Sequence, residues 1–180
     1  DVEPGRIVYT QWLNKRGGIE ADLTITRLEC NVYLIVTGGA GQVRDFNWLK
    51  RHIPEDARCV ATDVTSGIAV LGVQGPNARV LLQSLTKTDM SHDAFAFGHS
   101  IEIELGYAIV RASRITYMGE LGWELYMPTE FAACVYDVIV EAGDEYGLKH
   151  VGMHAMNSLR IEKGYRHWGH DITDEENPIQ

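Results

Sequence analysis

Strand-like segments come in runs in this sequence, and helical patterns separate the runs. In chain order, the pattern predicts three strands, a helix, two strands, a helix, three strands and two helices. The predicted strands are residues 7–13, 22–28, 32–36, 59–63, 68–74, 101–105, 107–112 and 123–127, and the predicted helices are residues 43–52, 76–85, 129–147 and 153–163. A doubly wound parallel sheet requires regular alternation of strands and helices, which is absent here. We therefore expect an α+β fold, with an antiparallel or mixed sheet, helices on one face, and a ferredoxin-like (split βαβ) core.

The stretch 114–128 holds the strongest chemical signal in the sequence. Two apolar, strand-like runs flank a short loop that carries Tyr117 and Glu120. Glu124 stands at the start of the second run, so we expect its carboxylate to face a protein wall and not open water. Burial of an unpaired charge is costly, so this carboxylate needs a partner. A planar ligand with several N–H donors would provide one, and so would an arginine in an ordinary ion-paired hairpin.

Composition excludes two classes of partner. The 180 residues carry a net charge of −9, whereas a nucleic-acid surface needs clustered Lys and Arg. No run approaches the ~18 consecutive apolar residues of a membrane span. The length suits one domain, or one domain with part of another. Because the sequence opens almost directly into a strand and stops at residues 177–180 without a closing helix, we expect a piece of a longer polypeptide.

Cysteine and histidine usage favours neither a disulfide framework nor a metal site. The three cysteines are odd in number, far apart and without a C-x-x-C pair, which predicts buried thiols in a reduced compartment. They are Cys30, Cys59 and Cys134. The histidines form two close pairs, His150 with His154 and His167 with His170. Neither pair has an evident third ligand, so no metal site is predicted.

Two further motifs have ordinary explanations. The glycine-rich loop 37–41 joins a predicted strand to a helix, which invites a phosphate-binding interpretation. No G-K-[ST] follows it, and Arg44 stands where the dinucleotide fingerprint has its third glycine. A tight strand-to-helix connection is therefore favoured. Nucleophilic catalysis also lacks support, because Ser66 and Ser158 have no G-x-S-x-G setting.

Four motifs in the same order resemble the aminomethyltransferase (glycine cleavage T protein) family and cover nearly the whole chain. They are YTQWLN with GGIEADL at 9–23, VQGPNA at 73–78, YMGELGWE at 117–124, and SLRIEKG with GHDI at 158–172. The variant of the last motif, residues 160–175, is more similar to the tetrahydrofolate-binding half of sarcosine and dimethylglycine dehydrogenases than to the free T protein. Those enzymes carry an FAD-dependent amine-oxidising half upstream, of which this sequence contains nothing.

This resemblance implies a tetrahydrofolate pocket and a role for each matching residue. Asp22 matches the catalytic acidic residue that lies beside the folate N5 and N10 atoms and positions or polarises the reacting nitrogen. Glu124 matches the carboxylate that accepts hydrogen bonds from the pterin N3–H and 2-amino group. The other positions carried over as folate-binding are Tyr9, Thr24, Tyr117, Arg160 and Trp168.

The resemblance also assigns parts of the folate to these other positions. Tyr9 and Tyr117 match pocket aromatics near the pterin and its linker, and Arg160 matches a cation near the folate tail. Trp168 replaces a family tyrosine. Two departures concern contacts made elsewhere in the family, since Thr37-Gly38 replaces an asparagine and Met156-Asn157 replaces Arg-Asp.

The implied function is tetrahydrofolate-dependent one-carbon (aminomethyl or methylene) transfer, as the folate-binding part of a sarcosine or dimethylglycine dehydrogenase-like enzyme. Residues 1–180 would then be a partial aminomethyltransferase-like domain that works with other segments of a parent chain and with an amine-derived one-carbon donor. A glycine cleavage T protein and a non-catalytic folate-binding regulatory module are the alternatives. The expected location is the bacterial cytoplasm or the mitochondrial matrix.

Overall fold

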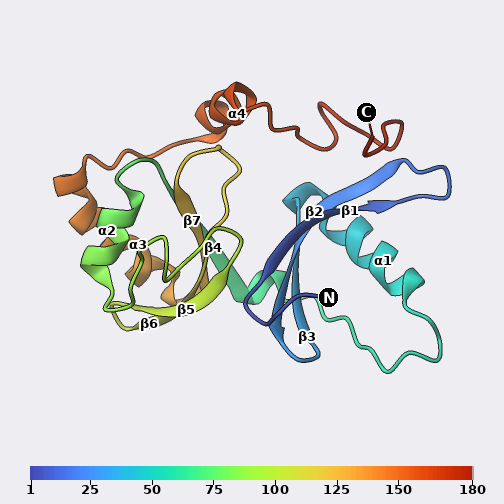
Figure 1. Ribbon diagram of the computed structural model, residues 1–180, viewed down its shortest axis with the longest axis horizontal. Helices are drawn as coiled ribbons and strands as arrows, with labels where there is room; N and C mark the ends of the chain where they lie inside the picture. Colours follow the sequence, from blue (N-terminus) through green and yellow to red (C-terminus); the bar gives the residue numbers. More distant parts are fainter. Residues whose placement is uncertain (180) are drawn as a thin grey trace. The chain divides into compact units, whose positions relative to one another are not determined.

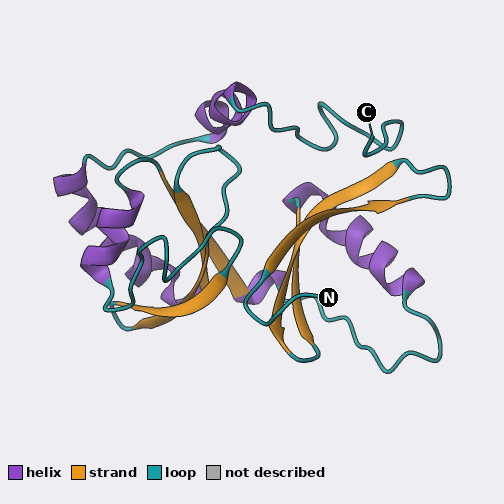
Figure 2. Cartoon of the chain, viewed as in Figure 1, coloured by secondary structure: helices purple, strands orange, loops and turns teal. Residues whose placement is uncertain are grey.

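The computed structural model describes residues 1–179 and shows two compact units in the chain (Figure 1). The first unit contains Asp1–Val64 and Arg166–Gln180, and the second contains Thr65–Tyr165. The second unit is thus inserted between the two segments of the first. Each unit has its own sheet and helices (Figure 2).

The first unit is built on a three-stranded antiparallel sheet with the order β1-β2-β3. Its elements are β1 (Ile7–Leu13), β2 (Ile19–Glu29), β3 (Val32–Thr37), the 3₁₀ turn η1 (Gly39–Gly41) and helix α1 (Gln42–His52). The β1–β2 turn is tight because the Asn14 side-chain oxygen accepts hydrogen bonds from the backbone N–H groups of Arg16 at 2.9 Å and Gly18 at 3.0 Å. Gly17 supplies the positive φ of 85° that this turn requires.

The segment after residue 165 returns to the first unit and binds the start of β2. The Trp168 Nε1 donates a hydrogen bond to the Ile19 carbonyl at 2.7 Å, and the Ile19 N–H donates to the Glu176 carbonyl at 3.0 Å. The guanidinium carbon of Arg44, at the start of α1, lies 3.8 Å from the centroid of the Trp168 ring. Residues far apart in the sequence therefore complete this unit together.

The second unit is a four-stranded sheet with the order β4-β7-β6-β5 and helices against it. Its elements are η2 (Thr65–Gly67), β4 (Ile68–Gln74), α2 (Ala78–Leu85), β5 (Ser100–Leu105), β6 (Ala108–Ser113), β7 (Gly122–Pro128), η3 (Thr129–Phe131), α3 (Ala132–Gly143), η4 (Asp144–Tyr146) and α4 (Met153–Glu162). Its main hydrophobic core joins one face of this sheet to α2 and α3.

The two faces of this sheet differ in chemistry. Along β7, Trp123, Leu125 and Met127 are buried in the core with α2 and α3. Because successive strand residues point to opposite faces, Glu124 and Tyr126 belong to the other, more polar face. Position 124 therefore lies in a central strand, on the face away from the helical core.

The α+β class is confirmed, but the predicted single sheet with a split βαβ core is wrong. The strands form two separate sheets, and every strand pair within them is antiparallel. A split βαβ unit requires two parallel strands joined by a helix, and α2 instead joins β4 to the opposite edge strand, β5. Local patterns identify strands but do not determine which strands pair.

Two smaller expectations are also wrong. The predicted strand at 59–63 has no strand partner in residues 1–179, and Val60 within it is 89% exposed. Of the three cysteines, Cys30 and Cys59 are exposed and Cys134 is half-buried, so the thiols are free but not buried as a set.

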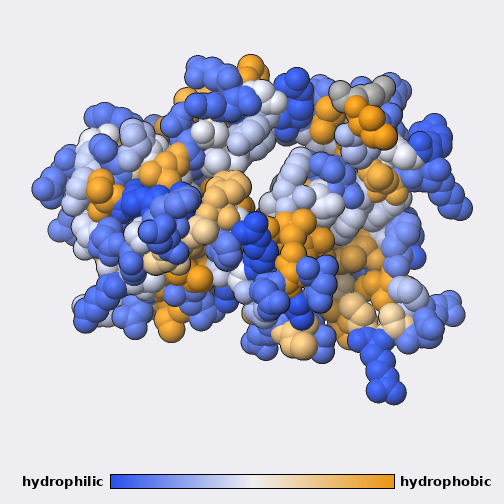
Figure 3. All heavy atoms as spheres, viewed as in Figure 1, coloured by the Kyte–Doolittle hydropathy of each residue, from blue (hydrophilic) through white to orange (hydrophobic). Residues whose placement is uncertain are grey.

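Within residues 1–179, the structure has no helix long and apolar enough to cross a membrane. Hydrophilic residues predominate on the visible surface (Figure 3), in keeping with the net charge of −9.

Candidate functional site

Glu124 is the third of the seven residues of β7, and the strands on both sides place small residues beside it. Gly72 on β4 and Ser113 on β6 lie directly opposite it in the antiparallel register. Directly opposite residues share a face of the sheet, so all three positions lie on the polar face. The Ser113 hydroxyl is buried and donates to Ser100 on β5 at 3.0 Å. The sheet itself thus fixes where the Glu124 carboxylate stands.

The carboxylate of Glu124 is shielded from water, and its described hydrogen-bond partner is neutral. The Tyr126 hydroxyl, two residues along the same strand face, donates a hydrogen bond to the Glu124 Oε2. Burial raises the pKa of the Glu124 carboxyl above its ordinary value, and the Tyr126 hydrogen bond opposes that shift in part. Burial, and then the neighbouring Glu124 charge, also raise the pKa of Tyr126.

An ordinary ion pair does not compensate the buried charge of the Glu124 carboxylate. Among residues 1–179, no Lys, Arg or His nitrogen forms a salt bridge with its carboxylate. An ionised carboxylate has about four acceptor positions, and one tyrosine hydroxyl occupies only one of them. The arrangement can therefore accept further hydrogen bonds from a ligand with N–H groups, including a planar one that binds both oxygens.

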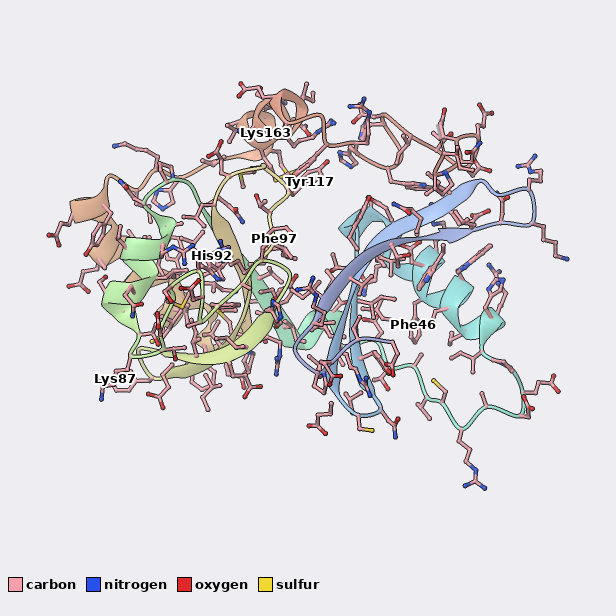
Figure 4. All side chains as sticks on the ribbon, in the orientation of Figure 1. Phe46, Lys87, His92, Phe97, Tyr117 and Lys163 are labelled. Carbon is pink, nitrogen blue, oxygen red and sulfur yellow. The ribbon has the colours of Figure 1, made fainter. Side chains whose placement is uncertain are left out.

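The loop before β7 is held at both of its ends. The Arg114 Nη1 donates to the Phe95 carbonyl at 2.6 Å, and the Gly75 N–H donates to the Leu121 carbonyl at 2.7 Å. The Glu120 carboxylate pairs with Lys163 at 3.3 Å, beyond the end of α4. Tyr117 is half-buried in this loop (Figure 4). Tyr117, the aromatic residue predicted for the site, therefore lies on a loop that is fixed in place by these contacts.

In the first unit, three of the predicted site residues lie together on β1 and β2. Tyr9 is directly opposite Thr24, and its hydroxyl donates a hydrogen bond to the Asp22 Oδ2 at 3.1 Å. Asp22 and Thr24 are half-buried, whereas Ala21 and Leu23 between and beside them are buried. Strand alternation therefore places Asp22 and Thr24 on one face, with Tyr9 across from them. Tyr9 is 59% exposed, so this cluster is open to a ligand.

The last two predicted residues have polar groups that are engaged within their own units. Arg160, 5% exposed, donates to the Asn157 side-chain oxygen at 3.3 Å and to the Tyr165 carbonyl at 3.0 Å. These bonds fasten the end of α4. Trp168 donates to Ile19 and lies against Arg44, as described above. Tyr9, Asp22, Thr24 and Trp168 belong to the first unit, and Tyr117, Glu124 and Arg160 belong to the second.

Sequence reasoning missed two residues beside Glu124. Tyr126 holds the carboxylate, and Gly72 leaves the position across from it without a side chain. The signal for Tyr126 was available, because residues two apart in a predicted strand share a face. Gly72 could not be placed, since its proximity to Glu124 depends on the pairing of β4 with β7.

Neither a metal-binding cluster nor the main hollow of the described chain involves the predicted site residues. Residues 1–179 contain no group of three His, Cys, Asp or Glu side chains positioned to hold a metal ion. A hollow of about 460 Å³ lies in the first unit, next to the β1–β2 turn and the end of α1. It is lined by Leu13, Asn14, Lys15, Arg16, Glu20, Trp48, Arg51 and His52. None of the predicted site residues lines this hollow.

Comparison with known proteins identifies similar chains. Sequence relatives include 4-methylaminobutanoate oxidase (formaldehyde-forming) of Paenarthrobacter nicotinovorans, 43% identical over 99% of this chain and 22% of that protein. They also include mitochondrial sarcosine dehydrogenase of Mus musculus, 37% identical over 98% of this chain and 21% of that protein. The chain thus spans about a fifth of the length of these relatives.

The fold has a close solved counterpart. The glycine cleavage system aminomethyltransferase T from Bartonella henselae matches with a TM-score of 0.81 and 27% identity, over 99% of this chain and 46% of that one. The sequence model of the GCVT N-terminal domain matches residues 1–180. Because that match extends over the whole chain, the protein belongs to the GCVT N-terminal domain family.

Proposed function

We propose that this chain binds tetrahydrofolate as part of an enzyme that oxidises N-methylated amines and passes their one-carbon unit to the folate. Family membership supports a folate site, and the dehydrogenase and oxidase relatives support an amine-derived donor. Residues 1–180 would be one part of the folate-binding region. The FAD that amine oxidation needs would be held by a part of the enzyme outside this sequence.

The observation that carries this proposal is the Glu124 carboxylate. It is half-buried, has no cationic partner in residues 1–179 and receives one neutral hydrogen bond from Tyr126. Such a group costs stability unless a ligand completes its hydrogen bonds. The N3–H and 2-amino group of a pterin offer parallel N–H donors, which two carboxylate oxygens can accept as a pair.

Asp22 and its neighbours fit the second half of the proposal. Tetrahydrofolate would supply the N5 and N10 atoms that take up the one-carbon unit. The Tyr9 hydroxyl binds Asp22 Oδ2 and so orients the carboxylate, while Oδ1 can accept a proton or a hydrogen bond from the reacting nitrogen. A positioned carboxylate of this kind contributes about 10²- to 10⁴-fold to proton-transfer steps. Thr24, on the same strand face, would contact the bound folate.

The other proposed contacts come from Tyr117, Arg160 and Trp168. Tyr117 would stack beside the pterin or its linker from the anchored loop. Arg160 and Trp168 would contribute differently, because their polar groups already bind the chain. We propose that each shapes the folate-contacting surface of its own unit, and that the guanidinium charge of Arg160 favours the carboxylates of the folate tail. A reduced compartment, bacterial cytoplasm or mitochondrial matrix, would suit a protein with three free cysteines.

A binding titration tests the proposal. We expect 5-formyltetrahydrofolate, a stable folate, to bind this chain or the longer polypeptide that carries it, as measured by calorimetry. Glu124→Gln should weaken binding about 10- to 100-fold, because it removes the charge from two hydrogen bonds. Glu104→Gln is the matched control, since Glu104 is an exposed glutamate on β5 of the same sheet, and it should leave the affinity unchanged. Equal affinities for the wild type and Glu124→Gln, or no binding by either, would reject the proposal.

A further inference from the structure

Gly72 is a glycine in the middle of a regular strand. It is the fifth of the seven residues of β4 and lies directly opposite Glu124 on β7. The β4–β7 register runs without interruption from Ile68 to Gln74, so no bulge is present. Glycine inside a strand is destabilising, because it loses more backbone freedom on folding and packs no side chain. Its presence here needs a reason.

The usual structural reasons for glycine do not apply at position 72. Its φ is not positive, unlike that of the nearby Gly75, whose φ of 121° favours glycine. A Cβ atom built on Gly72 has no heavy atom within 4 Å. Gly122 on the neighbouring strand is different, since its Cβ would lie 2.1 Å from the Gln74 side-chain oxygen. Gly72 therefore has open space that the chain itself does not fill.

The open space at position 72 lies next to Glu124. Side chains directly opposite each other in an antiparallel pair have Cβ atoms about 4.5–5.5 Å apart. A side chain at position 72 would therefore stand beside the Glu124 carboxylate, on the side of the carboxylate facing β4. In strands, an unexplained glycine often marks a place where a ligand comes close to the backbone.

We infer that Gly72 is a specificity-determining position, which keeps the sheet surface flat so that a planar heterocycle rich in N–H groups can lie edge-on to Glu124. This inference rests on the proposed folate function and adds the shape of the site to it. A pterin ring would rest over the β4 backbone at Gly72. Val70, on the same strand face and 50% exposed, would bound the ring on one side.

The test is a graded series, Gly72→Ala, Gly72→Val and Gly72→Leu, on the full chain. We expect the urea midpoint to stay the same or rise for Gly72→Val, because valine is favoured in strands and meets no clash here. The affinity for 5-formyltetrahydrofolate should fall with side-chain size, at least about tenfold for valine and further for leucine. Gly67→Val adds the same volume in η2, also into open space, and should leave the affinity unchanged.

The outcomes separate this inference from the proposed function. If the wild type binds folate, Glu124→Gln loses affinity and Gly72→Val does not, the folate function stands and the role of Gly72 is overturned. A clear loss of stability in Gly72→Val also overturns it, since the glycine would then be structural. If the wild type does not bind folate at all, the proposed function fails, and the Gly72 inference fails with it.

Discussion

The Tyr9–Asp22 hydrogen bond at 3.1 Å is the contact on which the proposed chemistry of the first unit depends. Asp22→Asn keeps the size of the side chain and its ability to accept from Tyr9, but removes the charge. We expect it to slow the formation of 5,10-methylenetetrahydrofolate by about 10²- to 10⁴-fold, with a much smaller effect on folate binding. A coupled assay of methylene transfer and a binding titration measure the two quantities separately.

Glu20→Gln is the control for that experiment. Glu20 is a half-buried glutamate on β2, two residues before Asp22, so the change alters the local charge without touching Asp22 itself. It should leave the transfer rate close to that of the wild type. Equal losses of transfer and binding in Asp22→Asn would mean that this residue only holds the folate.

Glu124 is expected to lower the stability of the free protein at neutral pH. Its pKa in the folded state is raised, so between the unfolded and folded pKa values the folded state binds more protons. The free energy of unfolding therefore decreases as the pH rises above about 4.5, the ordinary pKa of a glutamate. Glu124→Gln should remove this dependence and raise the melting temperature at pH 7, with the gain shrinking toward pH 4.

Thermal melts of the wild type and Glu124→Gln across pH 4 to 7 check this prediction. Glu104→Gln, melted under the same conditions, corrects for the loss of one exposed negative charge in the same sheet. A Glu124→Gln variant that is less stable than the wild type at pH 7 would show that the carboxylate supports the fold. The predicted gain in stability, set against a loss of folate affinity, is the behaviour of a group kept for binding.

At the scale of elements, the loop before β7 depends on Gly119. Its φ of 72° is a conformation that side chains disfavour, and its Cβ would lie 2.1 Å from the Lys163 Cγ. Gly119→Ala should therefore lower the free energy of unfolding by more than the ~1–2 kcal/mol that a left-handed φ costs alone. Urea denaturation measures this difference.

A second glycine separates the two causes. Gly147 has the same φ of 72°, but its Cβ would meet nothing within 4 Å. Gly147→Ala should therefore show the backbone cost alone, and the difference between the two variants gives the cost of displacing Lys163. Similar losses in both would mean that Lys163 moves aside freely, so that the Glu120–Lys163 pair does not hold the loop.

Local pattern predicted most elements, because their signals are carried by neighbouring residues. The alternation in β5, with Glu102 and Glu104 outward, and the end of the third helical segment at Gly147 were both readable from the sequence. The half-buried setting of Glu124 also followed from its place in an apolar run. The pairing of distant strands and segments could not be predicted. The division into two sheets, the missing strand at 59–63 and the approach of Gly72 to Glu124 all depend on which distant segments meet.

At the scale of the whole chain, the two units differ in how they are assembled from the sequence. The main core cluster lies entirely within the second unit, from Val73 to Ile139, and that unit is one continuous segment. The first unit is made of two segments that are separated by about a hundred residues. Its second segment binds the first through Trp168 and Glu176, both bonded to Ile19.

This difference predicts different behaviour of the separated pieces. The segment 65–165 should fold alone and unfold cooperatively in urea, because its sheet, helices and core are all internal to it. The segment 1–64 alone should be markedly less stable, since it loses the Trp168–Ile19 and Arg44–Trp168 contacts. A peptide of residues 166–180 added in trans should raise the stability of 1–64, with a gain that grows as the logarithm of the peptide concentration above its dissociation constant. A Trp168→Ala peptide is the control and should stabilise 1–64 less, because it keeps only the hydrogen bond between Glu176 and Ile19. If the wild-type and substituted peptides stabilise 1–64 equally, the Trp168 contacts contribute nothing to the first unit; if neither peptide stabilises it, the stability of that unit comes from the hairpin, β3 and α1 alone.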